Sequence, residues 1–230
     1  MCTGVRIRPA YFIVKTNIKM EIVEEKVKIM RERADEGLKQ YLFMKRMLDV
    51  GLSAVGLIIL AIPMAVIAIC IKIDSPGPVF FKQERLGLNG KPFMIYKFRT
   101  MRNDAEKGGP RWASKNDERC TKFGRRLRQS RLDELPQLLN ILKGEMSFVG
   151  PRPERAYFYD KFVAYIPDFP KRLQVKPGLT GLAQVNGGYD LIPEEKLKYD
   201  MEYIRSRSII MDFKCTIKTA RLVFTHEGAR

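Results

Sequence analysis

The sequence predicts an α+β chain with more helix than strand, and three patterns carry that prediction. Residues 50–71 run for 22 positions without a charged side chain, which favours a long apolar helix. Two apolar-aromatic runs, 79–81 and 93–98, flank a Gly-Leu-Asn-Gly turn at 87–90, which indicates a β-hairpin. Leucines recur at helical spacing before Gly144. The sequence has no βαβ alternation and no Gly-x-Gly-x-x-Gly motif, so a Rossmann nucleotide fold is not expected.

Composition narrows the chemistry. The 230 residues carry 42 Lys plus Arg against 26 Asp plus Glu, a net charge of +16, which points to nucleic acid, phosphorylated small molecules or an anionic membrane surface as partner. Four cysteines lie far apart, and His226 is the only histidine, expected at the surface. A zinc site, a disulfide framework and a Ser-His-Asp triad are therefore excluded, and carboxylates with Arg or Lys remain to do any catalysis.

The apolar run 50–71 is better explained by membrane insertion than by a core helix. At about 1.5 Å per residue, it is just long enough to cross a bilayer core of about 30 Å. Pro63 near its middle removes a backbone donor and should kink the helix. Both flanks are basic, so the positive-inside bias identifies no outer end. These residues alone leave a kinked spanning helix and a re-entrant hairpin equally open.

The remaining elements follow in chain order. A highly charged helix precedes the apolar run, and a mobile loop carrying Trp112 follows the hairpin. A helix then ends at Gly144, an aromatic-rich helix comes next, a loop starts at Pro177-Gly178, and one or two helices close the chain. The expected helices span residues 19–42, 121–144, 154–167 and 193–224, and the mobile loop spans residues 102–117.

Asp133 and Glu134 are adjacent acids that the sequence places at a helix start. Ser130 with Asp133 resembles a capping box, or the helix starts nearer Pro136, because proline is tolerated only early in a helix. Either way the helix dipole favours the anionic form, and an ionised Asp can attack phosphorus or bind Mg2+. The simpler interpretation is a helix cap followed by a solvated Glu.

Cations surround this pair in the sequence. Arg125, Arg126, Arg128 and Arg131 precede it, and Arg152 follows between two prolines that stiffen its backbone. The planar fork of arginine matches phosphate oxygens. Lys97 and Arg99 add two more cations at the end of the second predicted strand. A charge run is commonly a solvated face, but cations interleaved with acids, Gly and Pro indicate a phosphate-binding site.

Four motifs carry a family resemblance. KRMLD (45–49), DSPGPVFFKQERLGLNGKPFMIYKFRTM (74–101), LDELPQLLNILKGEMSFVGPRPE (132–154) and PGLTGLAQV (177–185) occur in this order. Together they resemble the bacterial sugar transferase family, the monotopic phosphoglycosyl transferases, over roughly four-fifths of the chain.

The resemblance implies a reaction. Enzymes of this family transfer a sugar 1-phosphate from a UDP-sugar to a polyprenol phosphate such as undecaprenyl phosphate, and release UMP. This is the first membrane step of bacterial glycan assembly. The family's acidic dyad matches Asp133 and Glu134, with Asp133 as the nucleophile that forms a covalent phosphosugar intermediate. Mg2+ is expected beside Asp133, and Glu134 is expected to accept a proton or to hold the local charge pattern.

The same resemblance assigns substrate contacts. Arg128 and Arg152 match arginines around the bound phosphates, and Lys97 and Arg99 are expected at the nucleotide-sugar diphosphate. Gln184 is expected as a further substrate contact. The sugar and the pathway are not encoded in these motifs, and the resemblance leaves a homo-oligomer open.

The resemblance also implies a membrane arrangement. Family members insert a helix-break-helix that enters the cytoplasmic leaflet and returns, and Pro63 fits the break, although Ile62 replaces a common Ser and Glu145 a common Asp. We therefore expect an N-terminal extension (1–44), a re-entrant hairpin (45–73) and a cytoplasmic catalytic domain (74–230) with a small β-hairpin and amphipathic helices. This is a short catalytic-core form in contact with lipid at the bacterial inner membrane.

Two other functions compete with this one. The net charge alone would suit a membrane-anchored basic nucleic-acid-binding protein, but no nucleic-acid-binding motif supports it, and we expect no nucleic-acid partner. A membrane scaffold, in which Asp133 and Glu134 only cap a helix, is the second.

Overall fold

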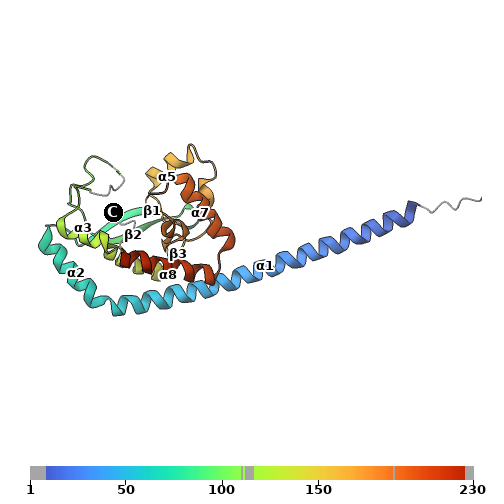
Figure 1. Cartoon of the computed structure of the whole chain (residues 1–230), viewed down its shortest axis with the longest axis horizontal. Coiled ribbons are helices and arrows are strands. Elements are labelled where there is room, and N and C mark those ends of the chain that lie inside the picture. Colours follow the sequence, from blue (N-terminus) through green and yellow to red (C-terminus); the bar gives the residue numbers. More distant parts are fainter. Residues whose placement is uncertain (1–8, 110, 112–116, 189, 226–230) are drawn as a thin grey trace, which may run out of the picture. The chain divides into compact units, whose positions relative to one another are not determined.

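The computed structural model describes residues 9–109, 111, 117–188 and 190–225 (Figure 1). Trp112, most of the tip of its loop and His226 lie outside these ranges. The chain divides into two compact units, Met1–Met44 and Lys45–Arg230. In the first unit the described residues belong to helix α1 (Pro9–Ile59), which includes the charged helix predicted for residues 19–42.

Helices α1 and α2 (Ala61–Asp74) form a pair bent by 61° at Leu60. The bend lies within one turn of Pro63, as the sequence predicted, because the proline ring cannot donate to the carbonyl of Ile59 and clashes with it. Among the described helices, none is long and apolar enough to cross a membrane alone, whereas this bent pair has the length and composition to do so.

The apolar surface of the bent pair is largely uncovered. Ile58, Ile62 and Ile73 are 77–80% exposed, while Ile67 and Ile71 are buried against the catalytic unit. A core helix of a soluble domain would bury its large apolar side chains on every side. The core-helix interpretation is therefore wrong for this segment.

The predicted hairpin is confirmed. Strands β1 (Phe80–Leu86) and β2 (Pro92–Phe98) pair antiparallel, with Phe80 opposite Phe98, and their rings stack with centroids 5.5 Å apart. The turn is a short 3-10 helix, η1 (Leu88–Gly90), in which Asn89 adopts a φ of 54°. Because Lys97 is the penultimate residue of β2, the pairing fixes where its side chain emerges.

The helix predicted for residues 121–144 is broken into three pieces. Thr121 caps its start and Gly144 ends it at a φ of 86°, as predicted. In between are α3 (Lys122–Gln129), the 3-10 helix η2 (Leu132–Gln137) and α4 (Leu138–Lys143). The predicted capping box is wrong, because the Ser130 hydroxyl donates back to α3, to the carbonyls of Arg126 and Leu127. Arg131 instead precedes η2 in the left-handed conformation.

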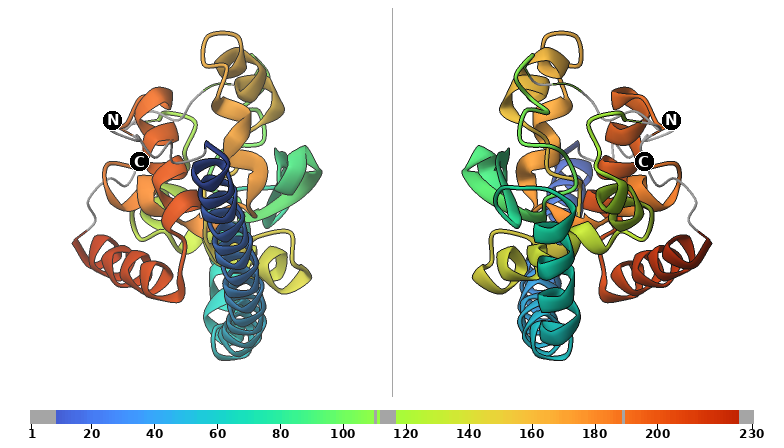
Figure 2. Two further views of the ribbon diagram at one scale, coloured as in Figure 1. Left: turned by 90° about the vertical axis from the view of Figure 1, so that its right-hand side faces the viewer. Right: turned by 90° about the vertical axis from the view of Figure 1, so that its left-hand side faces the viewer.

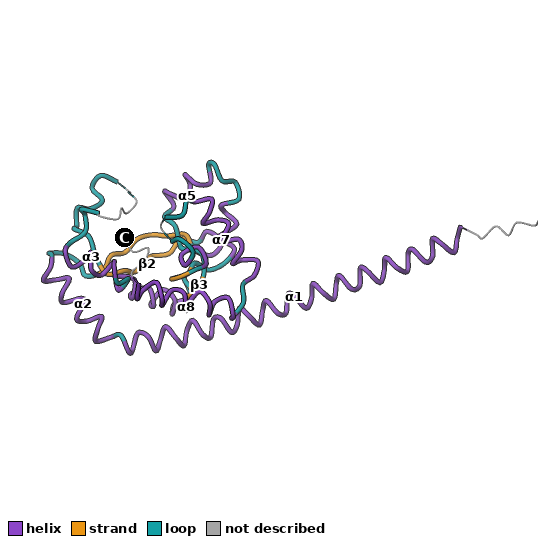
Figure 3. Tube along the Cα trace, in the orientation of Figure 1, coloured by secondary structure: helices purple, strands orange, loops and turns teal. Residues whose placement is uncertain are grey.

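A second, parallel strand pair escaped the sequence analysis. Strands β3 (Ser147–Val149) and β4 (Gly178–Thr180) are three residues each, and β4 occupies part of the predicted loop. Figure 2 shows the β1–β2 hairpin on one side of the catalytic unit and the last helix on the other, and Figure 3 shows how little strand there is. The remaining elements are α5 (Ala156–Val163), η3 (Phe169–Gln174), α6 (Leu182–Val185), α7 (Pro193–Ser206) and α8 (Ile209–Thr225).

The KRMLD motif fastens the end of α1 to the catalytic unit. Lys45 Nζ lies 2.7 Å from Asp212 Oδ2 on α8. The Arg46 guanidinium donates to the carbonyls of Ile141 and Leu142 at the end of α4, where helix carbonyls lack partners. Buried Asp49 accepts from Ser147 Oγ and Phe148 N at β3, both at 3.0 Å. We call these three residues the α1 clamp.

Gly124 in α3 allows the close approach that shapes this unit. A Cβ at Gly124 would overlap the carbonyl of Thr100, whereas a Cβ at Gly51 in α1 would meet nothing within 4 Å. We expect Gly124→Ala to lower the free energy of unfolding by about 2–4 kcal/mol, because backbone must move. Gly51→Ala should be neutral or stabilising by about 0.5–1 kcal/mol. Thermal unfolding measures both, and equal effects would contradict the overlap.

Candidate active site

A cavity of about 420 Å³ lies where the hairpin, α3, η2, residues 152–155 and α6 meet. Asp133 and Glu134 occupy the first turn of η2 and line this cavity. Asp133 is 7% exposed. The two adjacent acids therefore lie at the edge of a space large enough for a small-molecule substrate.

Glu134 is held by two cations. Lys97 Nζ and Arg152 Nη2 approach the same oxygen, Glu134 Oε1, at 2.6 and 2.7 Å. Burial by itself raises the pKa of Glu134, but the charges and hydrogen bonds of Arg152 and Lys97 together hold that pKa well below its usual range. Glu134 is consequently a permanent anion and a poor proton acceptor near neutral pH.

Asp133 has the opposite environment. Among the residues that the structure describes, none donates a hydrogen bond to its carboxylate. Burial raises the pKa of Asp133 to about 6, against the lowering effect of Lys97 and with a further increase from the Glu134 charge. The helix-start argument from the sequence therefore does not hold for Asp133, because burial outweighs it. At neutral pH Asp133 is an ionised carboxylate with weak solvation, which suits a nucleophile or a metal ligand.

The structure brings Arg128 to the same cavity. Its Nε donates to Thr100 Oγ1 at 2.8 Å, and its charge lowers the pKa of Asp133. Arg125 and Arg126, two residues of the same sequence cluster, are exposed on α3 and do not line the cavity. Part of the arginine cluster is thus a solvated face, and part is site.

Arg99 lines the cavity but is committed to the chain. Its two Nη atoms donate to both oxygens of Ser75, to the carbonyl of Pro76 and to Asn103 Oδ1, at 2.6–3.0 Å. A Cβ on Gly77, whose φ is 124°, would collide with this guanidinium. The guanidinium therefore fixes the segment that follows α2, and the structure does not group it with the acidic pair.

Gln184 on α6 also reaches the cavity. Its Nε2 donates to the carbonyl of Leu179 at 2.9 Å, and its buried Oε1 has no hydrogen-bond partner within the described part of the chain. A buried amide oxygen without a partner costs free energy, so a ligand donor that reaches it would be favoured.

Sequence reasoning missed several cavity residues. They share a positive charge or an aromatic ring, and Arg155 could have been found because it directly follows the GPRPE string. Arg131 could not, since nothing in the sequence marks its left-handed backbone at the edge of η2, a conformation that is costly for a non-glycine residue. The missed lining residues include Arg85, Arg102, Arg111, Arg119, Arg155, Phe158, Arg172 and Lys196.

An acidic pair inside a cavity lined mainly by arginines, beside an uncovered apolar helix pair, defines an enzyme that handles phosphorylated substrates. The sequence model of the bacterial sugar transferase family matches residues 40–226, and the chain belongs to this family. The resemblance noted in the four motifs is thereby confirmed.

Three curated relatives illustrate the family. UDP-N-acetylgalactosamine-undecaprenyl-phosphate N-acetylgalactosaminephosphotransferase of Aeromonas hydrophila is 40% identical over 83% of this chain. UDP-glucose:undecaprenyl-phosphate glucose-1-phosphate transferase of Caulobacter vibrioides is 41% identical over 80%, and the exopolysaccharide production protein PSS of Rhizobium leguminosarum bv. phaseoli is 41% identical over 77%. The matched segments cover 46%, 71% and 94% of these relatives, so the chain spans about half the length of the first.

Proposed function

We propose that this chain transfers a sugar 1-phosphate from a UDP-sugar to a polyprenol phosphate, giving a polyprenyl diphosphate sugar and UMP. The observation that carries the proposal is the division of the acidic pair. Glu134 is neutralised by Lys97 and Arg152, while Asp133 beside it has no hydrogen-bonding partner among the described residues. Relatives whose names specify UDP-sugars and undecaprenyl phosphate support the substrate class.

The reaction divides into two displacements at one phosphorus atom. Asp133 Oδ attacks the sugar-bearing phosphorus of the UDP-sugar, and the bond from that phosphorus to the bridging oxygen breaks as UMP leaves. A phosphate oxygen of the polyprenol phosphate then attacks the same phosphorus and releases the Asp133 carboxylate. Neither step needs a net proton transfer, which agrees with a Glu134 that is too weak a base to accept one.

The cations bind and orient the phosphates. Lys97 and Arg152 each have one contact on Glu134 and retain further N–H groups for phosphate oxygens, and Arg128 adds a third charge on the α3 side. Fixed cations next to the reacting phosphorus stabilise the charge that develops there. Gln184 Oε1 is placed to accept a hydrogen bond from the substrate.

The acidic pair also fits Mg2+. In the described ranges no three His, Cys, Asp or Glu side chains gather as a metal site. Magnesium commonly takes only one or two carboxylates together with substrate phosphates and water, so Asp133 with its unpartnered oxygens is the residue that would hold it. The bound ion would offset negative charge on the phosphate oxygens.

The bent helix pair supplies the membrane contact in this proposal. It enters the cytoplasmic leaflet of the bacterial inner membrane and returns to the same side, so the catalytic unit faces the cytoplasm, where UDP-sugars are found. The uncovered Ile58 and Ile62 near the bend support burial of that bend in lipid. Cysteines introduced at residues 50 and 73 should react only with cytoplasmic reagents, and labelling of one of them from outside would indicate a spanning helix.

The reaction is tested with purified protein, labelled UDP-sugar and no lipid acceptor. We expect label on the protein and a matching amount of UMP, followed by loss of that label when undecaprenyl phosphate is added. UDP-N-acetylgalactosamine and UDP-glucose come first in the sugar panel, because relatives for both are about equally identical to this chain. No UMP from any UDP-sugar would overturn the proposed function.

The first displacement should have an acid limb. The folded-state pKa of Asp133 is about 6, and only the ionised form attacks, so the rate of acceptor-free UMP release should fall about tenfold per pH unit below pH 6. The phosphates of a UDP-sugar have no second ionisation there, which isolates the enzyme's own titration. A rate that stays level from pH 7 to pH 5 would contradict this assignment.

A further inference from the structure

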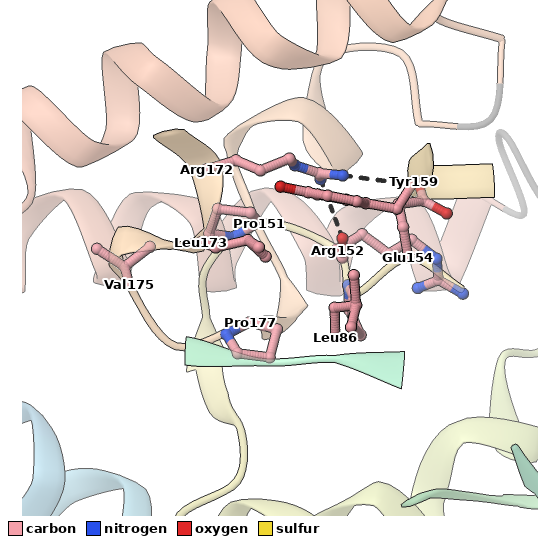
Figure 4. A pocket seen from close by; sticks show the side chains of 10 residues that line it. Leu86, Pro151, Arg152, Glu154, Tyr159, Arg172, Leu173, Val175 and Pro177 are labelled. Atoms are coloured by element: carbon pink, nitrogen blue, oxygen red, sulfur yellow. Dashed lines mark hydrogen bonds and ion pairs between the residues drawn. The ribbon is translucent and has the colours of Figure 1, made fainter. Parts of the chain in front are cut away.

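The segment Gly150–Glu154 carries Arg152 but makes little backbone structure of its own. Pro151 and Pro153 have no N–H group, so they cannot donate a backbone hydrogen bond. The segment lines the active-site cavity on one side and a second, much smaller cavity on the other, which Figure 4 shows. Whatever aims Arg152 must therefore come from neighbouring elements.

Four successive carbonyl oxygens of this segment each accept a hydrogen bond from elsewhere in the fold. The donors belong to β4, η3 and β1, and two of them are arginine side chains. The pairs are Gly178 N to Pro151 O at 2.9 Å, Arg172 Nη2 to Arg152 O at 3.0 Å, Arg85 Nη1 to Pro153 O at 3.1 Å and Leu86 N to Glu154 O at 3.0 Å.

Arg172 is the most enclosed of these donors. It is 3% exposed, and its guanidinium lies 4.8 Å from the centre of the Phe169 ring. Its Nη2 and Nε approach Oδ2 of Asp200 on α7, which is 2% exposed, at 2.8 and 3.0 Å. In Figure 4 the guanidinium points toward Arg152 and Glu154.

A buried ion pair is an expensive way to stabilise a fold. The desolvation of two charges commonly cancels their attraction, and apolar side chains of similar volume would serve as well. An arginine, however, has a rigid fork that reaches a carboxylate and a carbonyl at once, which neither lysine nor an apolar residue can do. The Asp200 carboxylate fixes the fork, and the fork fixes the Arg152 carbonyl.

We propose that the buried Arg172–Asp200 ion pair is a positioning device that aims the Arg152 guanidinium at Glu134 and at the phosphates of the substrate. The inference rests on the proposed function for the substrate only, since the contacts from Asp200 through Arg172 to Arg152 and Glu134 are all within the chain. Arg172 and Asp200 touch no reacting atom and act through Arg152.

The test uses Arg172→Lys in the full chain, with Asp200→Asn as a second variant in case the first does not fold. The matched control is Asp168→Asn, which removes the exposed Lys171–Asp168 pair next to the same short helix. We expect Arg172→Lys to lower kcat/KM for UMP formation by about 10- to 100-fold, as misplacement of a substrate-orienting group does. The control should match the wild type.

A double-mutant cycle separates positioning from general damage. In an Arg152→Ala background Arg172→Lys should have little further effect on kcat/KM, because its target is gone. Effects that multiply would overturn the proposal, as would a folded Arg172→Lys protein with wild-type kcat/KM.

A second measurement does not depend on activity. Asp133 faces Lys97 from β2, Arg128 from α3, Glu134 from η2 and Arg152 from the proline-flanked segment. A carboxyl 13C titration should therefore give Asp133 a higher pKa in Arg172→Lys than in the wild type, and no difference should appear between Arg152→Ala and the double variant. An inactive wild type would refute the proposed function, and this titration would still decide the role of the ion pair.

Discussion

Asp133→Asn should abolish UMP release and yet make the unliganded protein more stable at pH 8. The loss of turnover should be on the order of 10⁴-fold, because an amide cannot form the covalent phosphosugar intermediate. Label from UDP-sugar should no longer be trapped on the protein. Retained turnover would refute the nucleophile assignment.

The gain in stability follows from the sign of the pKa shift. The folded protein holds Asp133 at a pKa of about 6, above the ordinary value of 3.8. Its contribution to stability is therefore fully present below pH 3.8 and is lost as the pH rises through 6. At pH 8 the ionised carboxylate costs at most about 3 kcal/mol, which Asn removes.

Thermal unfolding at two pH values measures this effect. Asp133→Asn should unfold at a higher temperature than the wild type at pH 8, and the difference should shrink toward pH 4. Asp160→Asn, at an exposed position on α5, should show neither change. A destabilising Asp133→Asn at pH 8 would mean that the surrounding cations need this charge more than burial disfavours it.

Glu134→Gln should act in the opposite direction. The pKa of Glu134 is lowered, so its ion pairs with Lys97 and Arg152 stabilise the fold at neutral pH, and the variant should unfold at a lower temperature. UMP release should fall on the order of 10²-fold because both cations lose their shared anchor. The acid limb should move below pH 6, since the Glu134 charge raises the pKa of Asp133.

This variant also separates the two roles that the sequence left open for Glu134. A charge organiser affects the first displacement, which is seen as UMP release without acceptor. A proton acceptor for the lipid phosphate would affect only the second, with UMP release and the acid limb unchanged. Glu202→Gln, at an exposed position on α7, is the control and should behave as the wild type in both assays.

The parts of the fold that local chemistry determines were predictable. The Gly-Leu-Asn-Gly turn and its flanking apolar runs located the hairpin, and Pro63 located the bend to within one turn. The break inside 121–144 was not predictable, because Arg131 takes a left-handed conformation that its side chain does not favour. The strands β3 and β4 are too short for any period to register.

The site was predictable in its members and not in their division of labour. Charge type and motif order identified Asp133, Glu134, Lys97 and Arg152, and the structure brings these four together. Which acid is neutralised depends on side chains 37 and 18 residues away in sequence, and no local pattern contains that information. Arg99 shows the same limit, since its bonds to Ser75 and Pro76 come from the fold.

The α1 clamp has a consequence for the choice of acceptor. Arg46 grips the end of α4, and α4 continues directly from the turn that carries Asp133. The apolar helices and the nucleophile therefore move as one piece, and the height of Asp133 above the bilayer is a constant of the protein. In the proposed reaction the enzyme works like a tool of fixed reach, which selects its acceptor by the depth at which a phosphate lies as well as by what that phosphate is attached to.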